Sequence, residues 1–236
     1  MFSDMHTIKK TDKKIVYKID NISMITNDFL ENLYKSWPGN NIKGMIFIFD
    51  KKIENEHLYL SSISSKYYVA ICYSINKENL KKDIIVLPKT IKPKLLSPDE
   101  LKKLYYETKL IFYREWKEYL GERYINEFKF VANNYLSTAK VLYLEKDKKL
   151  TTLMTVIKWK DYTDIPVDWI TWVWIEKTIA KDERSIIHNY ISVWLRDNIE
   201  DRVQCVVNSF NVRSQRFFRK LGFIPECIHI IRKDLK

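Results

Sequence analysis

Hydrophobic and polar residues follow two different repeat patterns along this chain, and each pattern predicts a different kind of secondary-structure element. Short apolar or alternating runs rich in β-branched and aromatic residues are typical of strands, whereas apolar residues recurring every three or four positions are typical of helices. In the N-terminal part, the pattern predicts a helix at residues 27–37 and strands at residues 15–19, 44–49, 57–61 and 66–75. These elements predict a small α/β unit.

A strong helix start follows a proline-rich stretch, residues 87–98, that reads as a linker or a first edge strand. Ser97 is placed as N-cap, Pro98 at the first helical position, and Glu100 completes a capping box. An apolar, aromatic stripe at helical spacing continues to residue 120 and predicts a buried helix face. After Gly121, the pattern predicts a second helix at residues 123–136.

The remaining pattern predicts three strands, a helix, a strand, a helix and a strand. Their residues are 139–145, 150–159, 167–175, 185–195, 203–207, 212–221 and 228–232. Helices mixed with adjacent and separated strands predict an α/β protein with a mixed (α+β) sheet flanked by helices. We expect a small N-terminal α/β unit at residues 1–84 and a larger domain at residues 85–236.

Composition favours a soluble protein with a packed core, because 46% of the 236 residues are hydrophobic and no long apolar run is present. No signal pattern opens the sequence, so we expect a cytoplasmic protein. Cys72, Cys205 and Cys227 are few and widely spaced, which favours buried thiols over a disulfide framework. The four histidines share no ligand spacing, so we expect no metal.

The net charge of +11 is spread along the chain. Such an excess can raise affinity for nucleic acid or anionic ligands. No RNA motif and no interleaving of basic and aromatic residues accompanies it. Binding of nucleic acid or tRNA is therefore a weaker alternative, and a lysine-rich composition is also what an AT-rich genome produces.

The C-terminal segment carries the most specific motif. After the strand at residues 203–207, Asn208 and Asn211 favour a turn and a helix N-cap. An amphipathic helix follows, and Gly222 stands where a left-handed C-cap is expected, with the apolar Phe223 after it. The motif reads N-x-x-S-x-x-F-F-x-K-L-G-F from Asn211 to Phe223.

This motif resembles the last βαβ segment of the GNAT superfamily, the acyl-CoA-dependent N-acyltransferases. The order of elements from residue 84 onward also resembles that superfamily, so the likeness covers about two thirds of the chain. It implies a GNAT-like central sheet and transfer of an acyl group, most commonly acetyl, from acyl-CoA to a primary amine. The identity of the acceptor amine is left open, as is whether the protein forms a homodimer.

The resemblance also implies where coenzyme A would bind. Backbone groups of Trp174 and Ile175 would pair with the pantetheine arm, and the pyrophosphate would sit on the N-terminus of the next helix. Asn208 and Asn211 are the implied partners of the pantetheine amides. The motif residues Ser214 and Phe218 complete the implied cofactor contacts.

The sequence departs from the family in the phosphate loop, which normally reads Q/R-x-x-G-x-G. The corresponding segment, residues 180–187, reads AKDERSII and has no glycine. Lys181 matches the basic first position, Lys181 and Arg184 could bind phosphate through their side chains, and Ser185 could cap the helix. The alternative interpretation is a solvated charged turn at a helix start.

The sequence also departs from the family at the acid, because Phe218 stands where many members have a tyrosine that reprotonates the thiolate. The candidates for a general base are Asp168 and Glu176. Asp168 lies early in an apolar strand, where burial would raise the pKa of a carboxylate toward values suited to a base. The alternatives are a surface-facing Asp168 and a Glu176 that only ends the strand.

The sequence therefore predicts an N-acyltransferase. The main alternative from another functional class is a GNAT-shaped binding or regulatory module that has lost coenzyme A binding.

Overall fold

The structure is a computed structural model that describes residues 5–10, 14–36, 44–49 and 66–232. The strand expected at residues 57–61 lies outside these ranges. The chain divides into two compact units that interleave along the sequence. The first unit comprises Met1–Ser74, Asp161–Ile165 and Val206–Lys236, and the second comprises Ile75–Lys160 and Pro166–Cys205. Each unit is described by itself.

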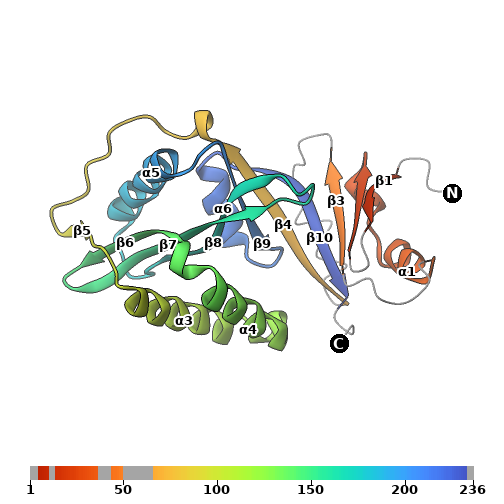
Figure 1. The fold of residues 1–236 in the computed structure, drawn as a ribbon, viewed down its shortest axis with the longest axis horizontal. Coiled ribbons are helices and arrows are strands. Elements are labelled where there is room, and N and C mark those ends of the chain that lie inside the picture. The colour runs from red at the N-terminus through yellow and green to blue at the C-terminus, as the bar shows by residue number, and fades with distance from the viewer. Residues whose placement is uncertain (1–4, 11–13, 37–43, 50–65, 233–236) are drawn as a thin grey trace. The chain divides into compact units, whose positions relative to one another are not determined.

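The first unit has strands in the order β1-β2-β3-β10-β4 (Figure 1). Strands β2 and β3 are parallel, and β10 is antiparallel to both of its neighbours. The elements of this unit are β1 (Met5–Lys10), β2 (Lys14–Ile19), η1 (Ile22–Met24), α1 (Asn27–Ser36), β3 (Gly44–Phe49), β4 (Tyr67–Asn76), α6 (Val212–Lys220) and β10 (Ile224–Arg232).

Buried strands with large apolar side chains form the core of the first unit. Tyr17 and Phe47 stack with their ring centroids 5.5 Å apart, and Phe29 of α1 packs on Phe47. Strand β10 lies between β3 and β4, with Cys227 opposite Ile48 on one side and Cys72 on the other. A C-terminal strand therefore completes a sheet that begins near the N-terminus.

The second unit has strands in the order β9-β8-β7-β6-β5, and only the β8–β9 pair is parallel. Its elements are η2 (Lys77–Asn79), β5 (Ile91–Pro93), α3 (Pro98–Glu115), α4 (Lys117–Asn134), η3 (Leu136–Thr138), β6 (Lys140–Lys146), β7 (Lys149–Lys160), β8 (Pro166–Ile175), α5 (Lys181–Asn198) and β9 (Arg202–Asn208). The last residues of β9, from Val206 on, belong to the first unit.

Helices cover both faces of the sheet in the second unit, with α3 and α4 on one face and α5 on the other (Figure 1). Alternating side chains of the strands divide between these faces. A buried core cluster joins α3, α4, η3, β6 and β7 through Leu101, Tyr105, Phe128, Ala132, Leu136, Tyr143 and Leu153. Helix α5 buries Ile187, Ile191 and Leu195 instead.

The mixed α/β fold expected from the sequence, a mixed sheet flanked by helices, is confirmed. The capping box is present, since Ser97 accepts from the Glu100 backbone N–H and Glu100 from that of Ser97. Gly121 has φ 59° inside α4 and Gly222 has φ 93° after α6, which are conformations that favour glycine. The division at residue 84 stays a prediction.

Three expectations about elements were wrong or incomplete. The helix expected to continue to residue 120 ends at Glu115, and the next helix begins at Lys117, with non-helical φ and ψ at Gly121 inside it. Strand β1 was not expected, because its sequence, MHTIKK, is short and polar. Helix α5 begins at Lys181 and not at Ser185. Asp182 and Glu183 occupy its first turn, where acidic side chains favourably oppose the positive end of the helix dipole.

Candidate functional site

Strand β8 contains a bulge in the middle of its pairing with β7. Thr155 of β7 lies opposite Trp172, and the next residue, Val156, lies opposite Ile170, so Thr171 is the extra residue. The hydroxyls of Thr171 and Thr155 share a hydrogen bond of 2.6 Å. Bulges bend a strand and redirect side chains, and they are frequent beside active sites.

Within the second unit, β8 pairs with β9 before this bulge. The paired residues in the second unit run from Asp168 opposite Val203 to Ile170 opposite Cys205, whereas β8 continues to Ile175. Among the described residues of the second unit, no strand pairs with the far edge of β8 beyond Ile170.

Trp174 and Ile175 lie on this segment, as expected from the sequence. They pair with Leu153 and Thr152 of β7 on one edge. Every side chain from Thr171 to Ile175 is half-buried. The two residues are therefore held by β7 while part of their surface stays open.

A short loop, residues 176–180, connects β8 to α5. The Glu176 backbone N–H donates to Thr151 O, and the Glu176 carboxylate accepts from the backbone N–H groups of Lys177 and Thr178 at 2.7 and 3.3 Å. Glu176 thus ends the strand and shapes the turn, which matches the structural alternative for this residue.

The residues expected to bind phosphate belong to the first turns of α5, not to a loop. Lys181 is the first helical residue and is exposed, after the N-cap Ala180, which has no side-chain cap. Arg184 donates from Nη2 to the carbonyls of Lys177 and Ile179 at 2.8 and 3.0 Å, so its guanidinium braces the preceding loop. The expected capping role of Ser185 is wrong, because Ser185 lies inside the helix.

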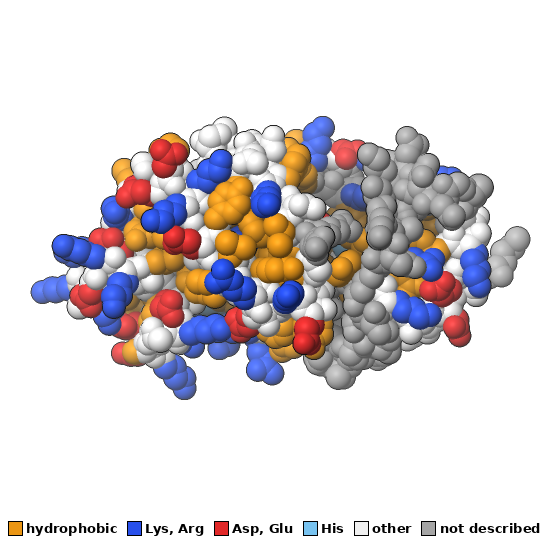
Figure 2. Space-filling model, turned by 90° about the horizontal axis from the view of Figure 1, so that it is seen from below, with side chains coloured by type: hydrophobic (Ala, Val, Ile, Leu, Met, Phe, Trp, Pro, Cys, Tyr) orange, Lys and Arg blue, Asp and Glu red, His pale blue; other side chains and the backbone are white. Residues whose placement is uncertain are grey.

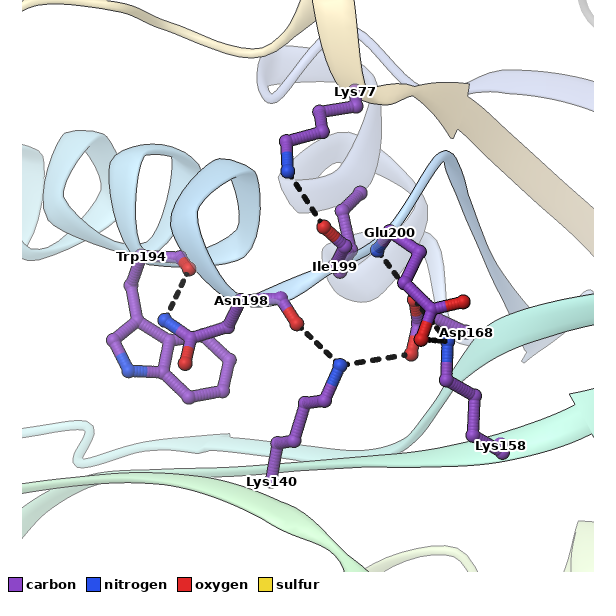
Figure 3. A network of polar contacts seen from close by, with 8 residues as sticks. All are labelled: Lys77, Lys140, Lys158, Asp168, Trp194, Asn198, Ile199 and Glu200. Carbon is purple, nitrogen blue, oxygen red and sulfur yellow. Dashed lines mark hydrogen bonds and ion pairs between the residues drawn. The ribbon is translucent and has the colours of Figure 1, made fainter.

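Asp168 is buried at the start of β8, which excludes the surface-facing alternative. Its carboxylate accepts from Lys158 Nζ at 3.1 Å, from the backbone N–H of Glu200 at 2.9 Å and from Lys140 Nζ at 3.5 Å (Figure 3). Lys158 also contacts the Glu200 carboxylate at 2.8 Å. These contacts match a structural anchor better than a general base.

The anchor extends to the C-terminal end of α5, as Figure 3 shows. Lys140 donates to the carbonyl of Asn198 at 2.5 Å, and Lys77 donates to that of Ile199 at 2.8 Å. The last carbonyls of a helix lack partners within the helix, and cations favour that end of its dipole. The cluster therefore fixes the end of α5 and the entry into β9 against β8.

The remaining expected residues lie in the first unit around α6. Asn211 caps α6, since its Oδ1 accepts from the Ser214 backbone N–H at 3.0 Å. The Asn208 carbonyl accepts from the backbone N–H of Asn211. Gln215 donates from Nε2 to the Ser209 carbonyl at 2.7 Å. The turn and cap expected here are confirmed, and contacts of these residues with coenzyme A stay a prediction.

Phe218, at the position of the family's tyrosine, is 5% exposed. It packs edge to face against Phe217 and Phe223, with both pairs of ring centroids 5.1 Å apart. Phe218 is thus a core residue of the first unit, and its cofactor contact stays a prediction.

The sequence interpretation missed Lys109 of α3, a lysine that is only 7% exposed. Its Nζ donates to the Thr171 carbonyl, at the bulge of β8, at 3.2 Å. The available signal was its position four residues after Tyr105, because a polar residue at helical spacing on an apolar stripe faces the core. Thr171 had no comparable signal, because a bulge depends on strand pairing.

The surface charges, the lengths of the helices and the metal-binding side chains bear on the alternative functions and ligands. On the face drawn in Figure 2, basic and acidic side chains are interspersed around hydrophobic ones, without one large basic patch. None of the described helices is long and apolar enough to cross a membrane. Within the described ranges, no group of three or more His, Cys, Asp or Glu residues could hold a metal ion.

The sequence matches no model of a protein family and no curated protein. Among solved structures, it is similar to a functionally unknown conserved protein from Staphylococcus epidermidis. That likeness has a TM-score of 0.52 and 15% identity, and covers 99% of this chain and 96% of the other. It shows a shared fold.

Solved structures with lower scores include N-acetyltransferases. A GCN5-related N-acetyltransferase from Kribbella flavida has a TM-score of 0.47 and 8% identity, and the likeness covers 98% of this chain and 87% of that one. A GNAT-family acetyltransferase from Colwellia psychrerythraea has a TM-score of 0.46 and 10% identity, with 98% and 81% covered.

Proposed function

We propose that this protein is an N-acyltransferase that moves an acyl group, most commonly acetyl, from acyl-CoA to a primary amine. The observation that carries the proposal is the form of β8. Within the second unit, the strand pairs with β9 up to Ile170, carries a bulge at Thr171 and then runs to Ile175, where no further strand of that unit pairs with the same edge.

The residues of the second unit fit an acyl-CoA ligand in two places. The amides of a pantetheine arm would pair with the open backbone edge around Trp174 and Ile175, as an added strand does. The N-terminus of α5 follows after one short loop and offers unpaired N–H groups to a pyrophosphate. Acetyl-CoA would supply the activated acyl group there.

A GNAT-shaped binding or regulatory module is the second candidate, and the start of α5 favours it. Residues 176–180 contain no glycine, Asp182 and Glu183 stand beside the N–H groups that would meet phosphate, and Arg184 is engaged with the loop carbonyls. Acidic side chains at that place repel a pyrophosphate.

Calorimetric titration with acetyl-CoA and with free coenzyme A separates the two candidates. The sharpest test of the helix N-terminus compares Lys181→Ala with Lys181→Pro. Both changes remove the charge, but only proline also removes a backbone N–H, and proline is well tolerated at the first helical position. Ala180, which precedes it, has φ −55° and ψ 149°, a conformation compatible with a following proline.

We expect micromolar binding that is weakened by Lys181→Ala and weakened further by Lys181→Pro, with Lys129→Ala on α4 as the charge-matched control. Arg184→Ala should also weaken binding, because it loosens the loop before the helix. Absence of binding at millimolar ligand would refute the enzyme proposal and favour the binding module.

A further inference from the structure

Lys109 occupies a box of aromatic rings between α3, α4 and β8. Its Nζ lies 4.1 Å from the ring centroid of Trp172, 5.2 Å from that of Tyr124 and 5.4 Å from that of Tyr105. A cation over the face of an aromatic ring is attracted by the ring quadrupole, most strongly for tryptophan. The three rings therefore hold the side-chain nitrogen at the bulge of β8.

The box is itself fixed by hydrogen bonds and ring contacts. The Trp172 indole Nε1–H donates to Thr108 Oγ1 at 2.9 Å. Phe112 packs on Trp172 and on Tyr124, with ring centroids 5.5 and 5.8 Å apart. Such support keeps the nitrogen of Lys109 beside the Thr171 carbonyl.

The charge of Lys109 is only partly compensated. Among the described residues, no carboxylate lies within ion-pair distance, and the Thr171 carbonyl is its hydrogen-bond acceptor. Burial lowers the pKa of Lys109 to about 7, and the more distant Glu127 of α4 opposes this. The amine is therefore partly neutral at physiological pH.

The other titratable groups around the box do not compete for the proton near neutral pH. Tyr105 of α3 and Tyr124 of α4 stay neutral phenols, because burial raises the pKa of each. The residues that β8 contributes beside the amine, Thr171 and Trp172, do not titrate in this range.

Both carboxylates expected to serve as a base have structural contacts. Asp168 is enclosed by two lysines and a backbone N–H, and Glu176 shapes the turn after β8. Lys109, in contrast, reaches the bulge of β8 from the face of the sheet that α3 and α4 cover, and its amine can take up a proton.

We propose that the amine of Lys109 is the proton acceptor for an amine substrate that reacts at the bulge of β8. This inference rests on the proposed N-acyl transfer. The substrate ammonium gives one proton to the neutral Lys109 amine, which becomes an ammonium held by the three rings. The substrate nitrogen then bonds to the acyl carbon as the carbon–sulfur bond breaks, and its second displaced proton ends on the sulfur.

The first experiment measures the proton affinity of Lys109 without any ligand. In protein labelled with 13C-lysine, the Lys109 13Cε resonance is identified by its loss in Lys109→Met and is followed from pH 5 to 11 by NMR. We expect a midpoint near 7. A Lys109 midpoint above about 9 would overturn the proposal.

The second experiment separates proton transfer from a positioning role. Lys109→Arg keeps a cation and a donor for the Thr171 carbonyl, but arginine does not deprotonate. Lys109→Met removes both. If Lys109 is the proton acceptor, both variants should lose roughly 100-fold or more in kcat. The kcat/KM of the natural protein should then rise with pH through about 7. Lys103→Arg and Lys103→Met should retain full activity.

The outcomes distinguish this inference from the proposed function. Activity retained in Lys109→Arg but lost in Lys109→Met would assign a positioning role to the cation and overturn the proposal. A lack of acetyl-CoA binding in calorimetry would refute the acyltransferase itself. Intact acetyl-CoA binding with a high Lys109 midpoint would refute the role of Lys109 alone.

Discussion

Two buried charges meet β8 at different points, and their surroundings differ in kind. At the start of the strand, the Asp168 carboxylate contacts two ammonium groups and a backbone N–H. At the bulge, the Lys109 ammonium contacts one carbonyl and three rings. A charged group with a full set of ion-pair and hydrogen-bond partners stays charged and holds the elements around it in place. Partial pairing leaves a group able to change its charge.

The largest expected effect is at Asp168. Asp168→Ala should lower the free energy of unfolding by about 3 kcal/mol, because it removes several charge-assisted hydrogen bonds and leaves the Glu200 N–H without its carboxylate partner. Urea denaturation followed by tryptophan fluorescence measures this. Asp197→Ala, which breaks an exposed pair with Arg196, should cost under about 0.5 kcal/mol. Equal losses in the two variants would contradict the anchor.

Lys109 should make stability depend on pH above neutrality. The folded protein releases this proton near pH 7, whereas the unfolded chain retains it up to its ordinary value of 10.5, so the unfolded state binds more protons in this window. Relative to Lys109→Met, the natural protein should gain about 1.4 kcal/mol of unfolding free energy per pH unit above about 7. Parallel stability curves for the two proteins would show that Lys109 titrates normally.

The first unit offers a contrasting case in His229. Burial, with Lys14 as a smaller cause, lowers the pKa of His229 to about 4 from 6.5. The unfolded state therefore binds more protons between these values, and stability should fall as pH decreases from about 6.5 toward about 4. His229→Leu should flatten this part of the curve in thermal denaturation at pH 4.5, 5.5 and 6.5. An unchanged acid slope would exclude His229 as its cause.

The smallest effect should come from one of the partners of Asp168. Lys158 is half-exposed and Lys140 stays beside the carboxylate, so Lys158→Met should cost only about 0.5 kcal/mol. The same denaturation assay measures it. A loss as large as that of Asp168→Ala would mean that the two lysines act as a single unit and not as separate neighbours.

Local chemistry explains which parts of the fold were predictable. The capping box of Ser97 and Glu100, the Asn211 cap and the glycine after α6 depend on residues close in sequence, and each was expected correctly. The start of α5 was missed by four positions, because Ser185 is the better capping residue type while Ala180 holds the actual position. Asx and serine preferences at caps are weaker than the packing of a helix on its sheet.

The candidate site was less predictable, because it depends on pairing between distant segments. Trp174 and Ile175 were expected from the end of a strand, but the bulge at Thr171 arises only from the register of β7 against β8. Burial of Asp168 depends on Lys140 and Lys158, which belong to other strands. Lys109 had a local signal in the stripe of α3, and its aromatic neighbours on α4 and β8 did not.

The position of β10 has a consequence for biosynthesis. Because β10 pairs with both β3 and β4, the sheet of the first unit is incomplete until residues 224–232 have left the ribosome. Until then, the facing edges of β3 and β4 are unpaired, and such edges can recruit other chains. The second unit ends at Cys205 and can form earlier. The middle part of the nascent chain would thus fold before the N-terminal part. A chain truncated before β10 would expose two apolar strand edges, which favour aggregation and chaperone binding.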